Sequence, residues 1–240
     1  MSKEQDLVPA RVQQMVPYKP GKPVEELERE LGIQGAIKLA SNENPYGAAP
    51  QVREALRAAL ENLGEYPDGA AFALRTAVAS FHGIDASEVV TANGSNELID
   101  LVCRTYPGPD DHVVFGKPSF VCYWLGCIAA GVEFTEVPLT DNLAWDVDAL
   151  LAAVTPATKV LFLANPNNPT GAYMGAADLE RLVRELPERV VLVADEAYVE
   201  FADAADFVSA TTFRHLRERL IILRTFSKAY GLASLRVGYA

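Results

Sequence analysis

Short apolar segments alternate with amphipathic ones along most of this chain, from residue 49 onward. Several of the short segments are continuous apolar runs, of which residues 190–194 and 220–223 are the clearest. A strand is apolar on both faces when helices cover both sides of its sheet, as happens in parallel sheets. The alternation therefore predicts an α/β fold, a three-layer αβα sandwich built on a mostly parallel sheet.

Periodicity and turn residues predict where the individual elements lie. Residues 1–22 are expected to form an irregular arm, because Pro9, Pro17, Pro20 and Gly21 interrupt any helix there. A helix is expected over residues 24–31, followed by Gly32 as its C-cap. Further helices are expected over residues 50–62, 70–82, 95–105, 119–130, 146–153, 176–186 and 206–218, and strands over residues 89–92, 111–115, 132–137, 158–164, 190–194 and 220–225.

Composition narrows the class of partner. A chain of 240 residues that is 50% hydrophobic can bury a full core, which argues against disorder. The formal net charge of -11 argues against nucleic acid and anionic membranes as partners, because both require clustered Lys and Arg. No apolar run approaches the roughly 18 residues of a membrane span, and the N-terminus lacks the apolar region of a secretory signal.

The cysteines and histidines carry little chemistry of their own. The three cysteines form no CxxC pair and no even disulfide framework; they are Cys103, Cys122 and Cys127. Unpaired thiols indicate a reducing compartment, so a cytoplasmic protein is expected. The three histidines have no Glu or Cys at ligand spacing, so no metal site is expected; they are His82, His112 and His215.

Polar residues open the helix that follows the expected strand 89–92. In open α/β sheets, ligands collect beyond the carboxyl ends of the strands. Ser95 and Asn96, within the run 93–97, would present free backbone N–H groups at such a place. These N–H groups and the helix dipole favour an anion such as phosphate. A plain helix N-cap is the alternative, and the chain contains no P-loop motif.

Two further strand ends carry candidate ligands. After the expected strand 158–164, two Asn–Pro steps fix the Asn168 amide near the strand end, although a purely structural turn is the alternative. Asp195 stands directly behind an apolar run, with Tyr198 on the same turn. A carboxylate is costly to bury there unless a cation or a hydrogen-bond donor meets it. A protonated heteroaromatic nitrogen would serve, and a helix-capping aspartate is the alternative.

The expected strand 220–225 is followed by Ser227 and Lys228. Shielding by Phe226 and Tyr230 would lower the pKa of this lysine and make it an amine nucleophile, whereas a surface lysine in a loop is the alternative. Arg236 has the planar fork that suits phosphate. Together the strand ends supply a phosphate cradle, an amide, a carboxylate and a nucleophilic lysine, which is the set that pyridoxal phosphate requires.

The chain resembles the fold-type-I pyridoxal-phosphate aminotransferases, and within them the histidinol-phosphate aminotransferase branch. The resemblance covers nearly the whole chain and rests on the motifs at residues 16–21, 39–47, 66–69, 93–97, 118–120, 165–171, 195–198 and 227–232. The last three are specific for the superfamily. The Pro-Tyr-x-Pro-Gly arm and the Asn-Glu-Asn-Pro-Tyr-Gly segment indicate the histidinol-phosphate branch.

The resemblance implies a role for each residue that would contact the cofactor ring. Lys228 would hold pyridoxal 5′-phosphate as the Schiff-base lysine and move a proton between the substrate α-carbon and cofactor C4′. Asp195 would keep the pyridine nitrogen protonated. Asn168 and Tyr198 would bond the phenolic oxygen, and Phe120 would stack on the ring. Lys228, Asp195 and Tyr198 would form the catalytic set.

The resemblance also implies phosphate and substrate ligands. The phosphate would be bound by Ser95, Asn96, Ser227 and Arg236. Tyr66 would reach the phosphate of a neighbouring subunit, which implies a homodimer with shared sites. Tyr18 and Asn44 would lie near the substrate.

The reaction implied is transfer of an amino group between L-histidinol phosphate and 2-oxoglutarate, giving imidazole acetol phosphate and glutamate in histidine biosynthesis. Residues 1–45 would be an arm with a contribution to a small domain, and residues 46–240 the cofactor-binding large domain. Because family members continue past the lysine segment with a C-terminal domain carrying a substrate arginine, a fragment is expected. The alternatives are an aromatic aminotransferase, a threonine-phosphate decarboxylase or an inactive cofactor-binding fragment.

Overall fold

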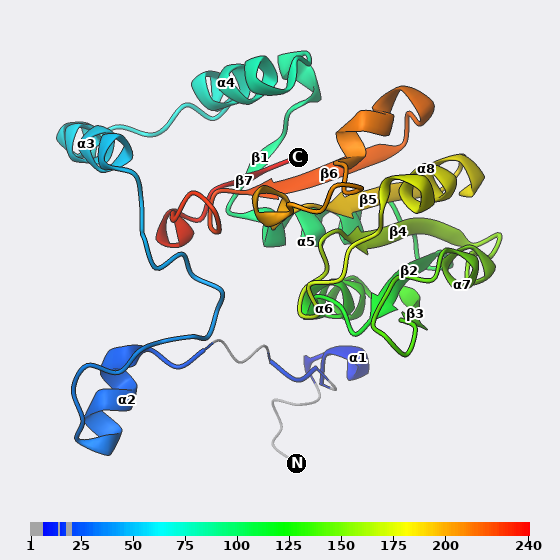
Figure 1. Ribbon diagram of the computed structural model, residues 1–240, viewed down its shortest axis with the longest axis horizontal. Coiled ribbons are helices and arrows are strands. Elements are labelled where there is room, and N and C mark those ends of the chain that lie inside the picture. The colour runs from blue at the N-terminus through cyan, green and yellow to red at the C-terminus, as the bar shows by residue number, and fades with distance from the viewer. Residues whose placement is uncertain (1–6, 14, 18–20) are drawn as a thin grey trace.

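A mixed sheet of seven strands lies at the centre of the part of the chain that the computed structural model describes, residues 7–13, 15–17 and 21–240 (Figure 1). The strand order is β1-β7-β6-β5-β4-β2-β3. In this sheet β7 runs opposite to the other six strands, so the prediction of a mostly parallel sheet is confirmed. The strands are β1 (Thr91–Ala92), β2 (His112–Lys117), β3 (Glu133–Pro138), β4 (Thr158–Ala164), β5 (Val191–Asp195), β6 (Leu220–Thr225) and β7 (Gly238–Tyr239).

Helices cover both faces of this sheet. For this strand order, the right-handed crossover rule puts the helices that precede β2 and β3 on one face, and the elements that precede β4, β5 and β6 on the other. On the first face α5 (Ser95–Thr105) packs against α6 (Val121–Ala130). On the second, α8 (Ala176–Glu185) packs against both α7 (Val147–Ala152) and the 3₁₀ helix η5 (Ala210–Leu216). The predicted three-layer arrangement is therefore present.

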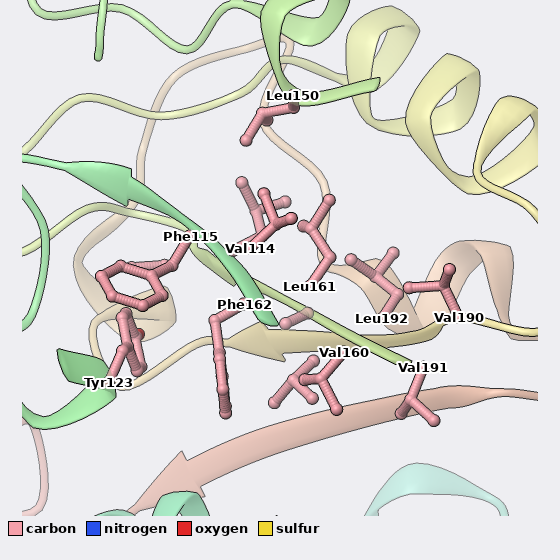
Figure 2. Packing of buried hydrophobic residues seen from close by; sticks show 14 of the residues in the cluster. Val114, Phe115, Tyr123, Leu150, Val160, Leu161, Phe162, Val190, Val191 and Leu192 are labelled. Carbon is pink, nitrogen blue, oxygen red and sulfur yellow. The ribbon is translucent and has the colours of Figure 1, made fainter. Parts of the chain in front are cut away.

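The core fills the space between the sheet and these two helix layers. Successive residues of a strand point to opposite faces, and Figure 2 shows this alternation: Leu161 points toward Leu150 of α7, whereas Phe162 lies on the side of Tyr123 in α6. All four side chains are fully buried. Strand β4 is apolar on both faces because each face meets a helix layer, as its continuous apolar run predicts.

The segment that precedes the sheet makes few contacts with it. It contains α1 (Ala10–Gln13), α2 (Val24–Leu31), α3 (Pro50–Ala59) with the 3₁₀ helix η2 (Leu60–Asn62), and α4 (Phe72–His82). In Figure 1, α2 and α3 stand apart from the sheet, and no described residue before Val78 is buried. The short 3₁₀ helices η3 (Ala86–Glu88), η4 (Val199–Phe201) and η6 (Ala233–Leu235) complete the structure. None of the helices in the described ranges is both long enough and apolar enough to cross a bilayer.

Three local expectations differ from the structure. The expected irregular arm contains α1, because the Pro9 carbonyl accepts hydrogen bonds from Val12 N and Gln13 N and proline suits a helix start. The α-helix expected over residues 206–218 is instead η5, where the β-branched pair Thr211 and Thr212 disfavours an α-helix. Strand β7 was not expected, because two residues are too short for a periodic signal.

Candidate active site

A cavity of about 480 Å³ opens beyond the carboxyl ends of β4, β5 and β6. Residues from distant parts of the chain meet there, because the carboxyl ends of parallel strands share one edge of the sheet. Nine of the predicted site residues line the cavity: Ser95, Asn96, Phe120, Asn168, Asp195, Tyr198, Ser227, Lys228 and Arg236. The structure thus brings most of the predicted set to a single place.

Asp195, the last residue of β5, presents a buried carboxylate at this cavity and is 5% exposed. Its Oδ2 accepts a hydrogen bond from the Tyr123 hydroxyl at 2.7 Å, and its Oδ1 accepts one from Ala197 N at 3.2 Å. Burial raises the pKa of Asp195, and these two hydrogen bonds oppose that effect. A cation in the cavity would therefore stabilise the carboxylate strongly.

Lys228 is half-buried between two segments that are remote in sequence. Its Nζ donates to the backbone oxygens of Ser41 at 3.0 Å and Asn42 at 3.3 Å, and lies 5.5 Å from the centre of the Tyr198 ring. Burial lowers the pKa of Lys228, with Glu43 opposing that effect and Arg236 adding to it. A lowered pKa increases the fraction of neutral amine, which is the nucleophilic form.

The first turn of α5 and Arg236 form a site suited to an anion. Gly94 occupies the N-cap position at φ 82° and provides no capping side chain. The Glu97 carboxylate accepts from Asn93 N at 2.6 Å and so folds back over the preceding turn. Arg236 Nη1 lies beside this turn and donates to Ser227 Oγ at 3.3 Å. Backbone N–H groups at a helix start and a guanidinium are a combination that binds phosphate.

Two features of the structure favour glycine at position 94. Its φ is in the left-handed half of the map, and an added Cβ would lie 2.5 Å from Arg236 Nη2. We expect Gly94→Ala to weaken binding of pyridoxal phosphate about tenfold, because it displaces the guanidinium, and to destabilise the fold by about 1–2 kcal/mol through backbone strain. Calorimetric titration and urea unfolding measure the two effects. Gly64→Ala is the control, since its Cβ would meet nothing within 4 Å; equal binding by both variants would contradict the cradle.

Three predicted site residues do not line the cavity. Asn44 lies close to it, because its Nδ2 donates to the backbone oxygen of Ala229, the neighbour of Lys228, at 2.8 Å. Tyr66 is fully exposed, so its predicted contact with a neighbouring subunit stays a prediction. Tyr18 lies outside the described residues.

Several cavity residues were not found from the sequence. Tyr123 follows Phe120 by three residues and so reaches the inner face of α6. Thr225, at the end of β6, donates from Oγ1 to Ser227 Oγ at 3.0 Å. Thr225 could have been found from the sequence, because it ends the expected strand 220–225 only three residues before Lys228. Ser41 and Asn42 belong to the motif at residues 39–47, but nothing in that motif indicated that their backbone oxygens meet Lys228. Within the described ranges, no group of three or more His, Cys, Asp or Glu side chains is arranged to hold a metal ion.

Comparison with known proteins identifies relatives of the whole described fold. Residues 34–240 match the family model described as aminotransferase class I and II. The histidinol-phosphate aminotransferase 2 of Pseudomonas aeruginosa is 48% identical over 233 residues, which are 95% of this chain and 62% of that protein. The histidinol-phosphate aminotransferase of Halalkalibacterium halodurans is 44% identical over 223 residues, 93% of this chain and 60% of that protein. The chain thus spans about 60% of the length of these relatives.

Solved structures agree in fold. The crystal structure of histidinol-phosphate aminotransferase from Sinorhizobium meliloti, in complex with pyridoxal-5′-phosphate, superposes with a TM-score of 0.84 at 30% identity, covering 96% of this chain and 61% of that one. Aspartate aminotransferase from Thermus thermophilus with maleate gives a TM-score of 0.84 at 27% identity, covering 97% of this chain and 63% of that one.

Proposed function

Because the chain belongs to the class I and II aminotransferase family, we propose that it binds pyridoxal 5′-phosphate and transfers an amino group between L-histidinol phosphate and 2-oxoglutarate. The products would be imidazole acetol phosphate and glutamate, in histidine biosynthesis. The observation that carries the proposal is one cavity holding a half-buried lysine, a buried carboxylate and an anion cradle. The substrate is chosen from the names of relatives that are 44–48% identical.

The cavity residues fit this cofactor by their chemistry. Bound pyridoxal phosphate supplies an aldehyde that reacts with amines and a ring that takes up the electrons of a broken C–H bond. Lys228 would hold the aldehyde carbon, and Asp195 would pair with the protonated ring nitrogen. Asn168 and Tyr198 would bond the phenolic oxygen, while Phe120 would cover one face of the ring.

The anion cradle would hold the cofactor phosphate. The N–H groups at Ser95 and Asn96 begin α5, and Ser227 and Arg236 face the same end of the cavity. The narrow space at Gly94 accords with a close approach of backbone to ligand, since a Cβ there would meet the guanidinium. These contacts would orient the ring so that its nitrogen meets Asp195.

Lys228 would also move the proton that transamination requires. With a substrate amine bound to the cofactor, the Lys228 Nζ would be free to act on the substrate. Burial lowers the pKa of Lys228, which favours the neutral amine. Nζ would then take the proton from the substrate α-carbon, as a general base placed within reach.

A second copy of the chain would complete the site. Many apolar side chains before residue 82 are exposed, including Leu39, Tyr46, Leu63, Tyr66 and Phe72. An exposed set of this kind indicates a surface that another subunit covers. We assign Tyr66 to the phosphate of the neighbouring subunit, and Tyr18 and Asn44 to the substrate.

We also propose domain boundaries and a cellular compartment for this protein. Residues 1–45 would be an arm with part of a small domain, and residues 46–240 the large domain. The three free cysteines accord with the cytoplasm.

A panel of amine donors tests the substrate. With 2-oxoglutarate as acceptor, we expect kcat/KM for L-histidinol phosphate to exceed that for L-phenylalanine at least about 100-fold, because a site that pairs with a substrate phosphate rejects donors lacking it. Preference for phenylalanine would indicate an aromatic aminotransferase. Release of carbon dioxide from threonine phosphate without an oxo acid would indicate a decarboxylase, and bound cofactor without turnover an inactive binding protein.

A further inference from the structure

Tyr123 lines the cavity beside Asp195. It lies on α6, is fully buried, and donates a hydrogen bond from its hydroxyl to Asp195 Oδ2 at 2.7 Å. Asp195 belongs to β5, 72 residues away in sequence. A tyrosine hydroxyl buried against a carboxylate must donate to it, since an ionised carboxylate only accepts hydrogen bonds.

Aromatic neighbours fix the position of this hydroxyl. The Tyr123 ring stacks on Phe162 with centroids 4.7 Å apart and planes 12° apart (Figure 2). Phe120 meets it edge-on at 5.9 Å, and Phe115 lies at 6.0 Å. A ring packed on several sides holds its polar end in one place. The hydroxyl is therefore aimed at Asp195 by the core and does not depend on a ligand.

The Tyr123 hydroxyl stays protonated, so it can always donate its hydrogen bond to Asp195. Burial, with the Asp195 charge and hydrogen bond adding to it, raises the pKa of Tyr123 well above its ordinary value. Other titratable groups near Asp195 are Cys122 on α6 and, among the described residues that line the same cavity, Glu43, Tyr198, Lys228 and Arg236. Burial and the nearby Asp195 raise the pKa of Cys122 to about 11, so this thiol stays neutral.

We propose that Tyr123 is a positioning residue for amino-group transfer: its hydroxyl keeps Asp195 ionised and aimed at the ring nitrogen of bound pyridoxal phosphate. The inference rests on the proposed function. A proton between a carboxylate and a pyridine nitrogen resides on the weaker acid of the pair. Donation by Tyr123 makes the carboxylate less basic, so the proton stays on the ring nitrogen. Without the hydroxyl the proton moves toward Asp195 and the ring becomes a poorer electron acceptor.

Nitrogen NMR tests this directly. The protein is loaded with pyridoxal phosphate labelled with ¹⁵N in the ring, whose chemical shift reports whether the nitrogen is protonated. Wild type is expected to show a protonated ring. Tyr123→Phe keeps the ring packing but removes the hydroxyl, so its signal should move toward the neutral ring and its affinity for the cofactor should fall about 10- to 100-fold. Tyr173→Phe is the matched control, because it removes a hydroxyl that donates at 2.7 Å to a surface carboxylate, Asp206.

A double-mutant cycle shows whether Tyr123 acts through Asp195. In the Asp195→Asn background, Tyr123→Phe should change cofactor affinity less than about twofold, because the charge that it supports is gone. If Tyr123→Phe does not fold, incorporation of 2,3-difluorotyrosine at position 123 keeps a more acidic hydroxyl, and the signal of a protonated ring should persist.

The outcomes separate the two proposals. Wild-type protein that fails to bind pyridoxal phosphate would overturn the proposed function and this inference with it. Wild-type protein that binds the cofactor, together with Tyr123→Phe protein that folds and retains the wild-type nitrogen shift and affinity, would overturn the role of Tyr123 alone.

Discussion

Replacement of Lys228 by alanine is expected to lower turnover about 10,000-fold or more, the scale on which loss of a covalent nucleophile acts. Pyridoxal phosphate would then bind only through its phosphate and ring contacts. Lys228 is the only lysine among the described residues that line the cavity, so no other lysine of the cavity can replace it. Borohydride reduction of the loaded protein, followed by mass spectrometry of its peptides, should find the cofactor on Lys228 in wild type and on no residue of the variant.

Two further variants separate charge from chemistry. Lys228→Arg keeps a positive charge in the cavity but provides no neutral amine, because guanidinium remains protonated, so we expect it to fail as well. Lys117→Ala removes an exposed lysine that pairs with Glu136 at 2.6 Å, and should behave as wild type. Full turnover by Lys228→Ala, or a covalent cofactor on another lysine, would refute the assignment.

The central strands were predictable because they are buried on both faces. Strands β4 and β5 give continuous apolar runs, since a helix layer meets each side, and such runs need no partner information to be found. By contrast, the helix expected over residues 206–218 depends on tertiary contacts. The Glu196 carboxylate accepts from Ala210 N at 2.6 Å and pairs with Arg224 at 2.6 Å, which fixes the start of η5. No local pattern indicates that contact.

Some residues of the site could likewise be predicted from the sequence and others could not. Asn168, Asp195 and Lys228 could be grouped from the sequence, because each follows a parallel strand and those strand ends share one edge. Ser41 could not, because its contact with Lys228 joins residues 187 positions apart through a backbone oxygen, which any residue type can provide. The Asn42 amide likewise meets the Tyr198 hydroxyl across 156 positions. The contacts between the segment that precedes the sheet and the strand ends are therefore the ones that sequence reasoning misses.

Asp195→Asn is expected to lower kcat about 100- to 10,000-fold, because it would remove one partner of the charge pair proposed between Asp195 and the ring nitrogen, a loss of about 3–5 kcal/mol. Asparagine has nearly the same size and can still accept from the Tyr123 hydroxyl, but it carries no charge. The loss should therefore fall more on kcat than on KM, since the electron-accepting power of the ring changes while the substrate contacts remain. Single-turnover measurements with L-histidinol phosphate separate the two terms.

Stability should move in the other direction, which distinguishes lost chemistry from lost folding. Burial raises the pKa of Asp195 above the ordinary 3.8, so the folded protein binds this proton more tightly than the unfolded chain does. The cofactor-free wild type therefore loses stability through this group as the pH rises above about 4, and Asp195→Asn does not. Urea unfolding at pH 4 and pH 7 should show that the free energy of unfolding of the variant, relative to that of wild type, is higher at pH 7 than at pH 4. Asp206→Asn, at a surface carboxylate, should show no such change. An Asp195→Asn protein that is inactive and also less stable at pH 7 would mean that Asp195 serves the fold rather than the cofactor.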